Sequence, residues 1–204
     1  MHGAAGAADT AGHALRADVE SALGGDEEPP LPRSPGVAKY EIAVVFGSDS
    51  DWPVMKKCVA QLQTFDVEPM VEVMSAHRNP ARVAEFAEGA SRAGFKVIIA
   101  GAGMSAALAG TLAAHTALPV IGVPLAGSSL KGIDALLATV QMPPGVPVGS
   151  VGIGDAGAKN AAFLAIRILA LSDERLASAY DQFKARLADG VAEKNAAIQA
   201  ERAG

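Results

Sequence analysis

From residue 40 onward, short apolar runs alternate with longer segments whose apolar positions recur every three or four residues. A short apolar run bounded by Gly, Pro or Asp is typical of a buried strand, whereas the longer period indicates an amphipathic helix. The chain therefore predicts five strands, each followed by a helix. The strands are expected at residues 40–46, 67–74, 96–100, 118–124 and 146–153. Four helices are expected at residues 51–65, 80–94, 129–142 and 157–171, and another begins within residues 101–110.

Strands that alternate with helices predict a parallel sheet, because the connection between parallel neighbours must cross a face of the sheet. We therefore expect an α/β domain over residues 38–172, with three layers and a flavodoxin-like parallel sheet. Residues 1–37, rich in Ala, Gly, Pro and acids, are interpreted as a flexible N-terminal lead. Residues 173–204 are interpreted as a C-terminal helical tail whose apolar positions pack on a neighbouring subunit.

Composition argues against several classes of protein. A net charge of −5 with scattered Lys and Arg lacks the basic stripe of a nucleic-acid binder. The apolar runs are interrupted before they reach the about 18 residues that a membrane span needs. The first residues hold acids throughout rather than a basic start and an apolar block, so no export signal is expected. The single cysteine, Cys58, excludes an internal disulfide and suits a reducing cytosol, and we expect a cytoplasmic protein.

Candidate chemistry gathers where the predicted strands end, which is where parallel sheets of this kind bind ligands. These segments are residues 47–52, 75–78, 101–110 and the stretch after residue 124. The first offers the Ser48 and Ser50 hydroxyls and free N–H groups at a helix start, a setting that accepts phosphate. Asp51 stays open between a helix cap and an acceptor for a ribose or an amine.

The second segment, Ser-Ala-His-Arg, combines side chains that can bind an anion with one that can transfer a proton. Arg78 can hold a phosphate through two parallel hydrogen bonds, and Ser75 can donate a third. The imidazole of His77 can both donate and accept a proton, so it can serve as acid and as base within one turnover. We interpret Arg78 as anion-binding and His77 as the general acid and base.

The third segment, GAGMSAALAG, lets backbone approach a ligand closely. Its glycines lack the spacing of a dinucleotide fingerprint, which argues against an NAD site. Lys131, Lys159 and Asn160 stay open between solvated and ligand-binding roles, and His115 is interpreted as a cap at a helix end.

Four motifs, taken in order, resemble the PurE family of de novo purine biosynthesis, which comprises N5-carboxyaminoimidazole ribonucleotide (N5-CAIR) mutases and the related 5-aminoimidazole ribonucleotide (AIR) carboxylases. They are GSDSDW, SAHRNP, QMPPGVPVGSV and AKNAAFLAIRIL, and the resemblance covers residues 40–172. It implies a flavodoxin-like fold and a homo-oligomer, an octamer, with sites at subunit contacts. It also implies a ribonucleotide substrate, no metal or other cofactor, and functional coupling to an ATP-dependent N5-CAIR synthetase.

By this resemblance, His77 protonates the carbamate nitrogen to release carbon dioxide, and later removes the proton from ring carbon 4 after recombination. No metal ligand is expected. The substrate-binding residues would be Gly47, Ser48, Ser50, Asp51, Ser75, Ala76, Arg78, Gly101, Ala102, Gly103, Ser105 and Leu108.

The loop after the third strand departs from the family pattern. Mutases commonly have GGAAHLPG there, whereas this chain has GMSAALAG, with Ala107 at the histidine position. Carboxylases tend to have an Arg-Ser-Asn-x-Leu segment, which Ser105 and Leu108 echo, so a direct AIR carboxylase stays open. SAHR rather than SAHK and the segment QMPPGVPVG favour the mutase.

Three other readings fit less well. A carboxylase of another heterocycle is disfavoured by the intact motifs. A flavin module would supply more aromatic side chains than the 4% in this chain. A receiver module would carry an Asp at the end of the third strand and a Lys at the end of the fifth, and this chain has neither.

Overall fold

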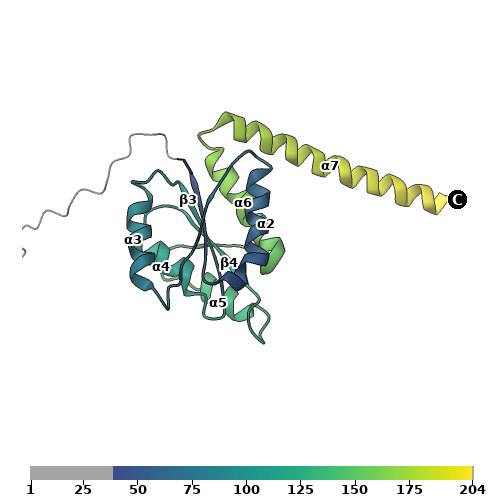
Figure 1. The fold of residues 1–204 in the computed structure, drawn as a ribbon. Helices are drawn as coiled ribbons and strands as arrows, with labels where there is room; N and C mark the ends of the chain where they lie inside the picture. Colours follow the sequence, from purple (N-terminus) through teal and green to yellow (C-terminus); the bar gives the residue numbers. More distant parts are fainter. Residues whose placement is uncertain (1–38, 204) are drawn as a thin grey trace, which may run out of the picture. The chain divides into compact units, whose positions relative to one another are not determined.

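Five parallel strands form one sheet in the computed structural model, which describes residues 39–203 (Figure 1). Their order, β2-β1-β3-β4-β5, is the expected flavodoxin-like order, and the predicted fold class is confirmed. The lead expected over residues 1–37 lies outside the described residues. The strands are β1 (Ile42–Phe46), β2 (Met70–Val73), β3 (Val97–Gly103), β4 (Val120–Leu125) and β5 (Gly149–Ser150).

Helices cover both faces of the sheet, with α2 and α6 on one face and α3 and α4 on the other (Figure 1). A short 3-10 turn precedes α2, and α5 packs against β4 beside α4. The elements are η1 (Asp49–Asp51), α2 (Trp52–Gln63), α3 (Pro80–Ala90), α4 (Ala107–His115), α5 (Ile133–Val140), α6 (Gly154–Leu169) and α7 (Glu174–Ala203).

Strand β1 lies at the centre of the hydrophobic core, and all five of its residues are buried. Ile42, Val44 and Phe46 face the cluster under α2 and α6, whereas Ala43 and Val45 face the cluster under α3 and α4. A strand covered on both faces reads as an uninterrupted apolar run, which is why the sequence pattern located it.

Several elements differ by a few residues from the expected ranges, and two of these differences have a clear cause in the backbone. Strand β5 pairs only over Gly149–Ser150, because Pro147 has no N–H for a ladder and glycine weakens strand pairing. Helix α5 begins at Ile133 instead of residue 129, since Lys131 (φ 51°) and Gly132 (φ 90°) adopt left-handed backbone that no α-helix continues.

The only cysteine of the chain, Cys58 on α2, is fully buried in the core. Burial disfavours the thiolate and raises the pKa of this thiol to about 12. Cys58 therefore serves packing and stays protonated at neutral pH.

The C-terminal helix α7 is anchored only at its start. Leu176 is buried, and Tyr180 and Phe183 join an aromatic cluster with Phe65 and Phe163, in which the Phe163 and Phe183 rings stack 4.6 Å apart. Farther along, the apolar side chains are more than half exposed: Leu187 55%, Val191 67% and Ile198 56%. The helical extension is confirmed; its packing on a neighbouring subunit stays a prediction. Within residues 39–203, no helix combines the length and apolar character needed to cross a bilayer.

Gly157 on α6 generates a prediction about the packing of this helix. A Cβ atom there would overlap the carbonyl oxygen of Gly152, a backbone atom that cannot rotate away. We expect Gly157→Ala to lower the free energy of unfolding by about 3 kcal/mol. Gly190→Ala is the matched control, because nothing lies within 4 Å of its Cβ position on α7. Alanine should raise helix stability there by about 0.5 to 1 kcal/mol. Denaturant unfolding that moved both variants in the same direction would contradict this close approach.

Candidate active site

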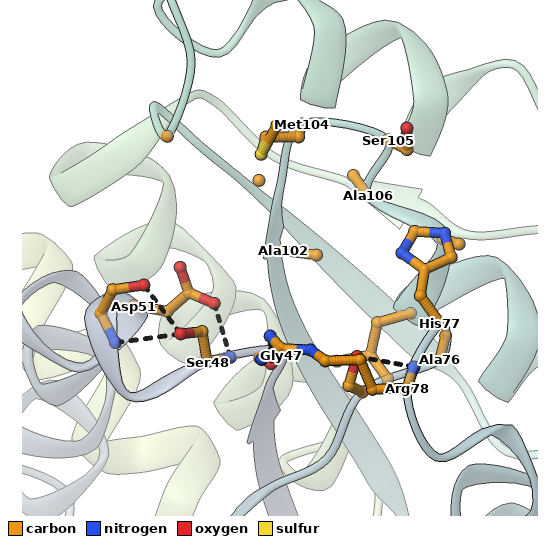
Figure 2. A pocket seen from close by; sticks show the side chains of 16 residues that line it. Gly47, Ser48, Asp51, Ala76, His77, Arg78, Ala102, Met104, Ser105 and Ala106 are labelled. Atoms are coloured by element: carbon orange, nitrogen blue, oxygen red, sulfur yellow. Dashed lines mark hydrogen bonds between the residues drawn. The ribbon is translucent and has the colours of Figure 1, made fainter.

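A cavity of about 360 Å³ opens at the carboxyl edge of the sheet (Figure 2). Its walls come from the segments that follow β1, β2, β3 and β4, the four strand ends that the sequence singled out. The order in which successive strands are added to the sheet reverses between β1 and β3, and ligands of such sheets bind at this switch point. The lining residues are Gly47, Ser48, Ser50, Asp51, Ser75, Ala76, His77, Arg78, Ala102, Gly103, Met104, Ser105, Ala106, Ala107, Leu108 and Gly127.

The segment after β1 forms a closed polar turn. Ser48 caps the 3-10 turn, with its Oγ accepting from the Ser50 N–H, and the Asp51 carboxylate accepts from the Ser48 N–H at 3.0 Å. The Ser50 hydroxyl donates to the Ser48 Oγ at 2.9 Å. This reciprocal arrangement is a capping box, so Asp51 closes the turn from its third position and does not cap α2.

Asp51 also belongs to the cavity wall. Burial raises the pKa of this carboxyl group, while the Ser48 N–H and the charge of Arg78 oppose that rise. The carboxylate therefore closes the turn and lines the cavity, and its role as an acceptor for a ribose or an amine stays a prediction.

Arg78 crosses the cavity floor. Its guanidinium donates to the Gly47 carbonyl oxygen at 3.2 Å and so reaches from the β2–α3 connection to the end of β1. Its own N–H donates to the Ser75 Oγ, which leaves the Ser75 hydroxyl proton available. Within residues 39–203 no carboxylate forms an ion pair with Arg78. The remaining N–H groups of the guanidinium can therefore bind an anion.

His77 is exposed and lines the cavity. Figure 2 shows its imidazole on the side that the loop with Ser105 and Ala106 closes. The ring makes no hydrogen bond with any residue of the described chain, so both nitrogens can meet a ligand. One cavity thus holds an imidazole for proton transfer and a guanidinium with spare N–H groups for an anion.

The loop after β3 supplies an apolar wall opposite the polar turn. Met104 and Ala106 both have positive φ, 55° and 29°, which costs of order 1 to 3 kcal/mol for each such residue. Ala107 and Leu108 continue this wall into α4. This side of the cavity therefore offers mainly apolar contacts to a bound molecule.

Twelve of the thirteen residues selected from the sequence line this cavity, and Gly101 does not. Gly101 lies beneath it, where its carbonyl accepts from the Gly47 N–H at 3.2 Å and a side chain would collide with Met55. Sequence reasoning did not select Met104, Ala106, Ala107 and Gly127. The first three belong to the loop whose divergence the sequence had shown. Gly127 has no side chain, and only the strand-end rule pointed to its segment.

The other open candidates lie away from the cavity. His115 ends α4, with its Nδ1 3.0 Å from a carboxylate oxygen of Glu88, in keeping with a role at a helix end. Lys131, Lys159 and Asn160 do not line the cavity. In the described part of the chain, no cluster of three or more His, Cys, Asp or Glu side chains could hold a metal ion.

Comparison with known proteins gives a consistent result. Residues 41–190 match the family model described as AIR carboxylase. The N5-carboxyaminoimidazole ribonucleotide mutase of Mycobacterium tuberculosis is 49% identical over 166 residues, covering 81% of this chain and 94% of the relative. The enzyme of the same name from Haemophilus influenzae is 51% identical over 144 residues, 71% of this chain and 88% of that one.

A solved structure agrees with these relatives. The crystal structure of Treponema denticola PurE matches with a TM-score of 0.68 and 28% identity, over 74% of this chain and 94% of that chain. The family indicated by the four sequence motifs is confirmed: the chain belongs to the AIR carboxylase family.

Proposed function

We propose that this protein is an N5-carboxyaminoimidazole ribonucleotide mutase, which moves a carboxylate from the exocyclic amine of the nucleotide to ring carbon 4 through AIR and carbon dioxide. The observation that carries the proposal is that the unbonded imidazole of His77 and the guanidinium of Arg78, with N–H groups to spare, line one cavity with a polar and an apolar wall. The names of the relatives, about half identical to this chain, support the same reaction.

The polar wall fits a ribonucleotide. The nucleotide phosphate would bind to the guanidinium of Arg78 and the hydroxyls of Ser48 and Ser75, where charge-assisted hydrogen bonds are strongest. The carboxylate of Asp51, held in place by the turn, would accept from a ribose hydroxyl. Binding at both points would hold the imidazole ring of the substrate against His77.

The reaction then needs two proton transfers, one from the imidazole of His77 and one back to it. His77 as the acid protonates the carbamate nitrogen, the N–C bond breaks, and carbon dioxide leaves with AIR as the electron-rich partner. Ring carbon 4 attacks the carbon dioxide, which forms the new C–C bond and leaves a proton on that carbon. The neutral imidazole removes this proton, so the ring regains aromaticity and His77 its starting state.

The apolar loop has a part in this scheme. Carbon dioxide must stay beside the ring between the two bond changes, and the wall from Met104 to Leu108 would keep water away from both fragments. Ser105 is the only side chain of this wall with a hydroxyl, and it would orient the carboxylate.

A direct AIR carboxylase is the second candidate. The specific observation that favours it is the GMSAALAG loop, in which Ala107 stands where mutases commonly have histidine. Both reactions share the carbon–carbon step, so only the carboxyl donor separates them.

We also propose that the protein works as a homo-oligomer, an octamer, in the cytoplasm. Supporting this assembly, α5 and the turn before it present an exposed apolar stripe, with Leu130 61%, Ile133 52%, Leu137 51% and Val140 50% exposed. A stripe of this spacing on one helix face suits burial against another copy.

The mutase reaction would consume the product of an ATP-dependent N5-CAIR synthetase, which is the proposed functional partner. Operation without a metal or other cofactor stays a prediction.

Substrate supply tests the proposed reaction. We expect the protein to convert N5-CAIR to the carbon-carboxylated product without dependence on dissolved carbon dioxide, as followed by absorbance. Turnover of AIR that scales with carbon dioxide, with no use of N5-CAIR, would identify the carboxylase instead. Failure with both donors would overturn the proposed function.

Substitution at the two central residues should separate chemistry from binding. His77→Asn is expected to reduce turnover by at least about 100-fold while calorimetry still detects the nucleotide. Arg78→Ala is expected to weaken nucleotide binding by about 10- to 100-fold. Equal effects of both changes on binding would contradict this division.

Assembly can be tested on the α5 stripe. The double substitution Ile133→Glu and Leu137→Glu places two charges on that face, so the molar mass in solution should fall below that of the wild type. Leu171→Glu is the control, because this residue is 87% exposed and lies outside the stripe. A monomeric wild-type protein in light scattering would rule out the oligomer.

A further inference from the structure

We propose that Glu72 and Arg82 are positioning residues for His77, because their ion pair ties together the two ends of the connection that carries the imidazole. This inference rests on the proposed function, in which His77 moves the proton. Glu72 and Arg82 would join the residues on which the proposed reaction depends, although they do not line the cavity.

The connection between β2 and α3 is held at its middle by short-range hydrogen bonds from the Asn79 N–H to the Ser75 carbonyl oxygen at 2.9 Å and from the Arg78 N–H to the Ser75 Oγ at 3.2 Å. Met74, at its start, is 3% exposed and donates its N–H to the Phe46 carbonyl oxygen at 3.0 Å. From His77 to Pro80 the residues are exposed, and His77 itself bonds to nothing in the described chain. The place of the imidazole is therefore set by the path of the backbone between the strand and the helix.

The ion pair spans this path. Arg82, in the first turn of α3, donates its Nε to Glu72 Oε1 at 3.1 Å and its terminal nitrogen to Oε1 and Oε2 at 3.0 and 3.2 Å. A two-pronged pair of this kind fixes orientation as well as distance. The backbone N–H of Arg82 also donates to the Asn79 side chain at 3.4 Å. Arg82 is thus held at its side chain by the strand and at its backbone by the cap.

The position of Glu72 in its strand supports a dedicated role. Side chains two residues apart share a face of a strand, and the residues on either side, Met70 and Met74, pack in the core cluster under α3. An acid at the site between them stands where an apolar side chain would suit the packing. Its charge there is compensated by Arg82, whose pKa is raised by the hydrogen bond that its guanidinium donates to Glu72.

Stability alone does not explain this pair. The two side chains are 40% and 31% exposed, and pairs with this much solvent contact contribute about 1 kcal/mol or less to folding. Catalysis is more sensitive, since a displacement of about 1 Å at a reacting group can cost about 100-fold in rate. Arg78 is less affected by such a displacement, because the Gly47 carbonyl anchors it independently.

Three variants of the full chain test this role. Glu72→Gln keeps the size of the side chain but removes its charge. Arg82→Lys keeps the charge but loses the planar guanidinium that donates two hydrogen bonds to one carboxylate. Glu85→Gln is the matched control, because Glu85 pairs with the same Arg82 at 3.3 Å within α3 and does not span the connection. Glu72→Gln and Arg82→Lys should lower kcat on N5-CAIR by about tenfold or more, with KM changed by less than about threefold. The control should match the wild type.

Backbone hydrogen exchange gives a readout that does not need activity. In Glu72→Gln, the amides of Arg78 and Asn79, which donate to Ser75 across the connection, should exchange about tenfold faster, while the strands β1 and β3 stay unchanged. Unchanged exchange in this segment would overturn the inference, and so would an unchanged kcat in an active protein. If the wild type turned over neither donor, the proposed reaction would fail, and exchange would still decide whether the pair orders the connection.

Discussion

The backbone of Gly47 is the point on which the site depends. Its N–H donates to the Gly101 carbonyl at the end of β3, and its own carbonyl accepts from Arg78 on the β2–α3 connection. One residue thus joins the ends of β1, β2 and β3, next to the switch point between β1 and β3 at which the strand order reverses. The polar turn with Ser48 and Asp51 follows directly, so its geometry is set by the same anchor.

Most of this architecture could be predicted from the sequence, because its causes are local. A strand buried on both faces must be apolar throughout, as Ile42–Phe46 is, and a strand-end rule then places the polar segments together. At such a strand end, the side chains of Arg78 and His77 indicate anion binding and proton transfer. Of the four motifs that identified the family, GSDSDW and SAHRNP lie at the sheet edge that forms the cavity.

The features that escaped prediction arise from contacts distant in sequence or from backbone conformation. Glu72 and Arg82 are ten positions apart on different elements, and neither signals the other in a hydrophobic pattern. The left-handed backbone of Met104 and Ala106 breaks the usual preference of L-residues, so no propensity points to it. Gly101 belongs to the same small-residue segment as the lining residues Ala102 and Gly103, but its place below the cavity follows from the packing of Met55.

The burial of Cys58 has a practical consequence. It is the only sulfhydryl in 204 residues, and the core around α2 shields it from reagents in solution. A thiol introduced on the surface, for instance on the α3 side of the cavity, would therefore react alone with a maleimide dye. Loop motion during turnover can then be followed by fluorescence from a single fluorophore, without first removing a native reactive group.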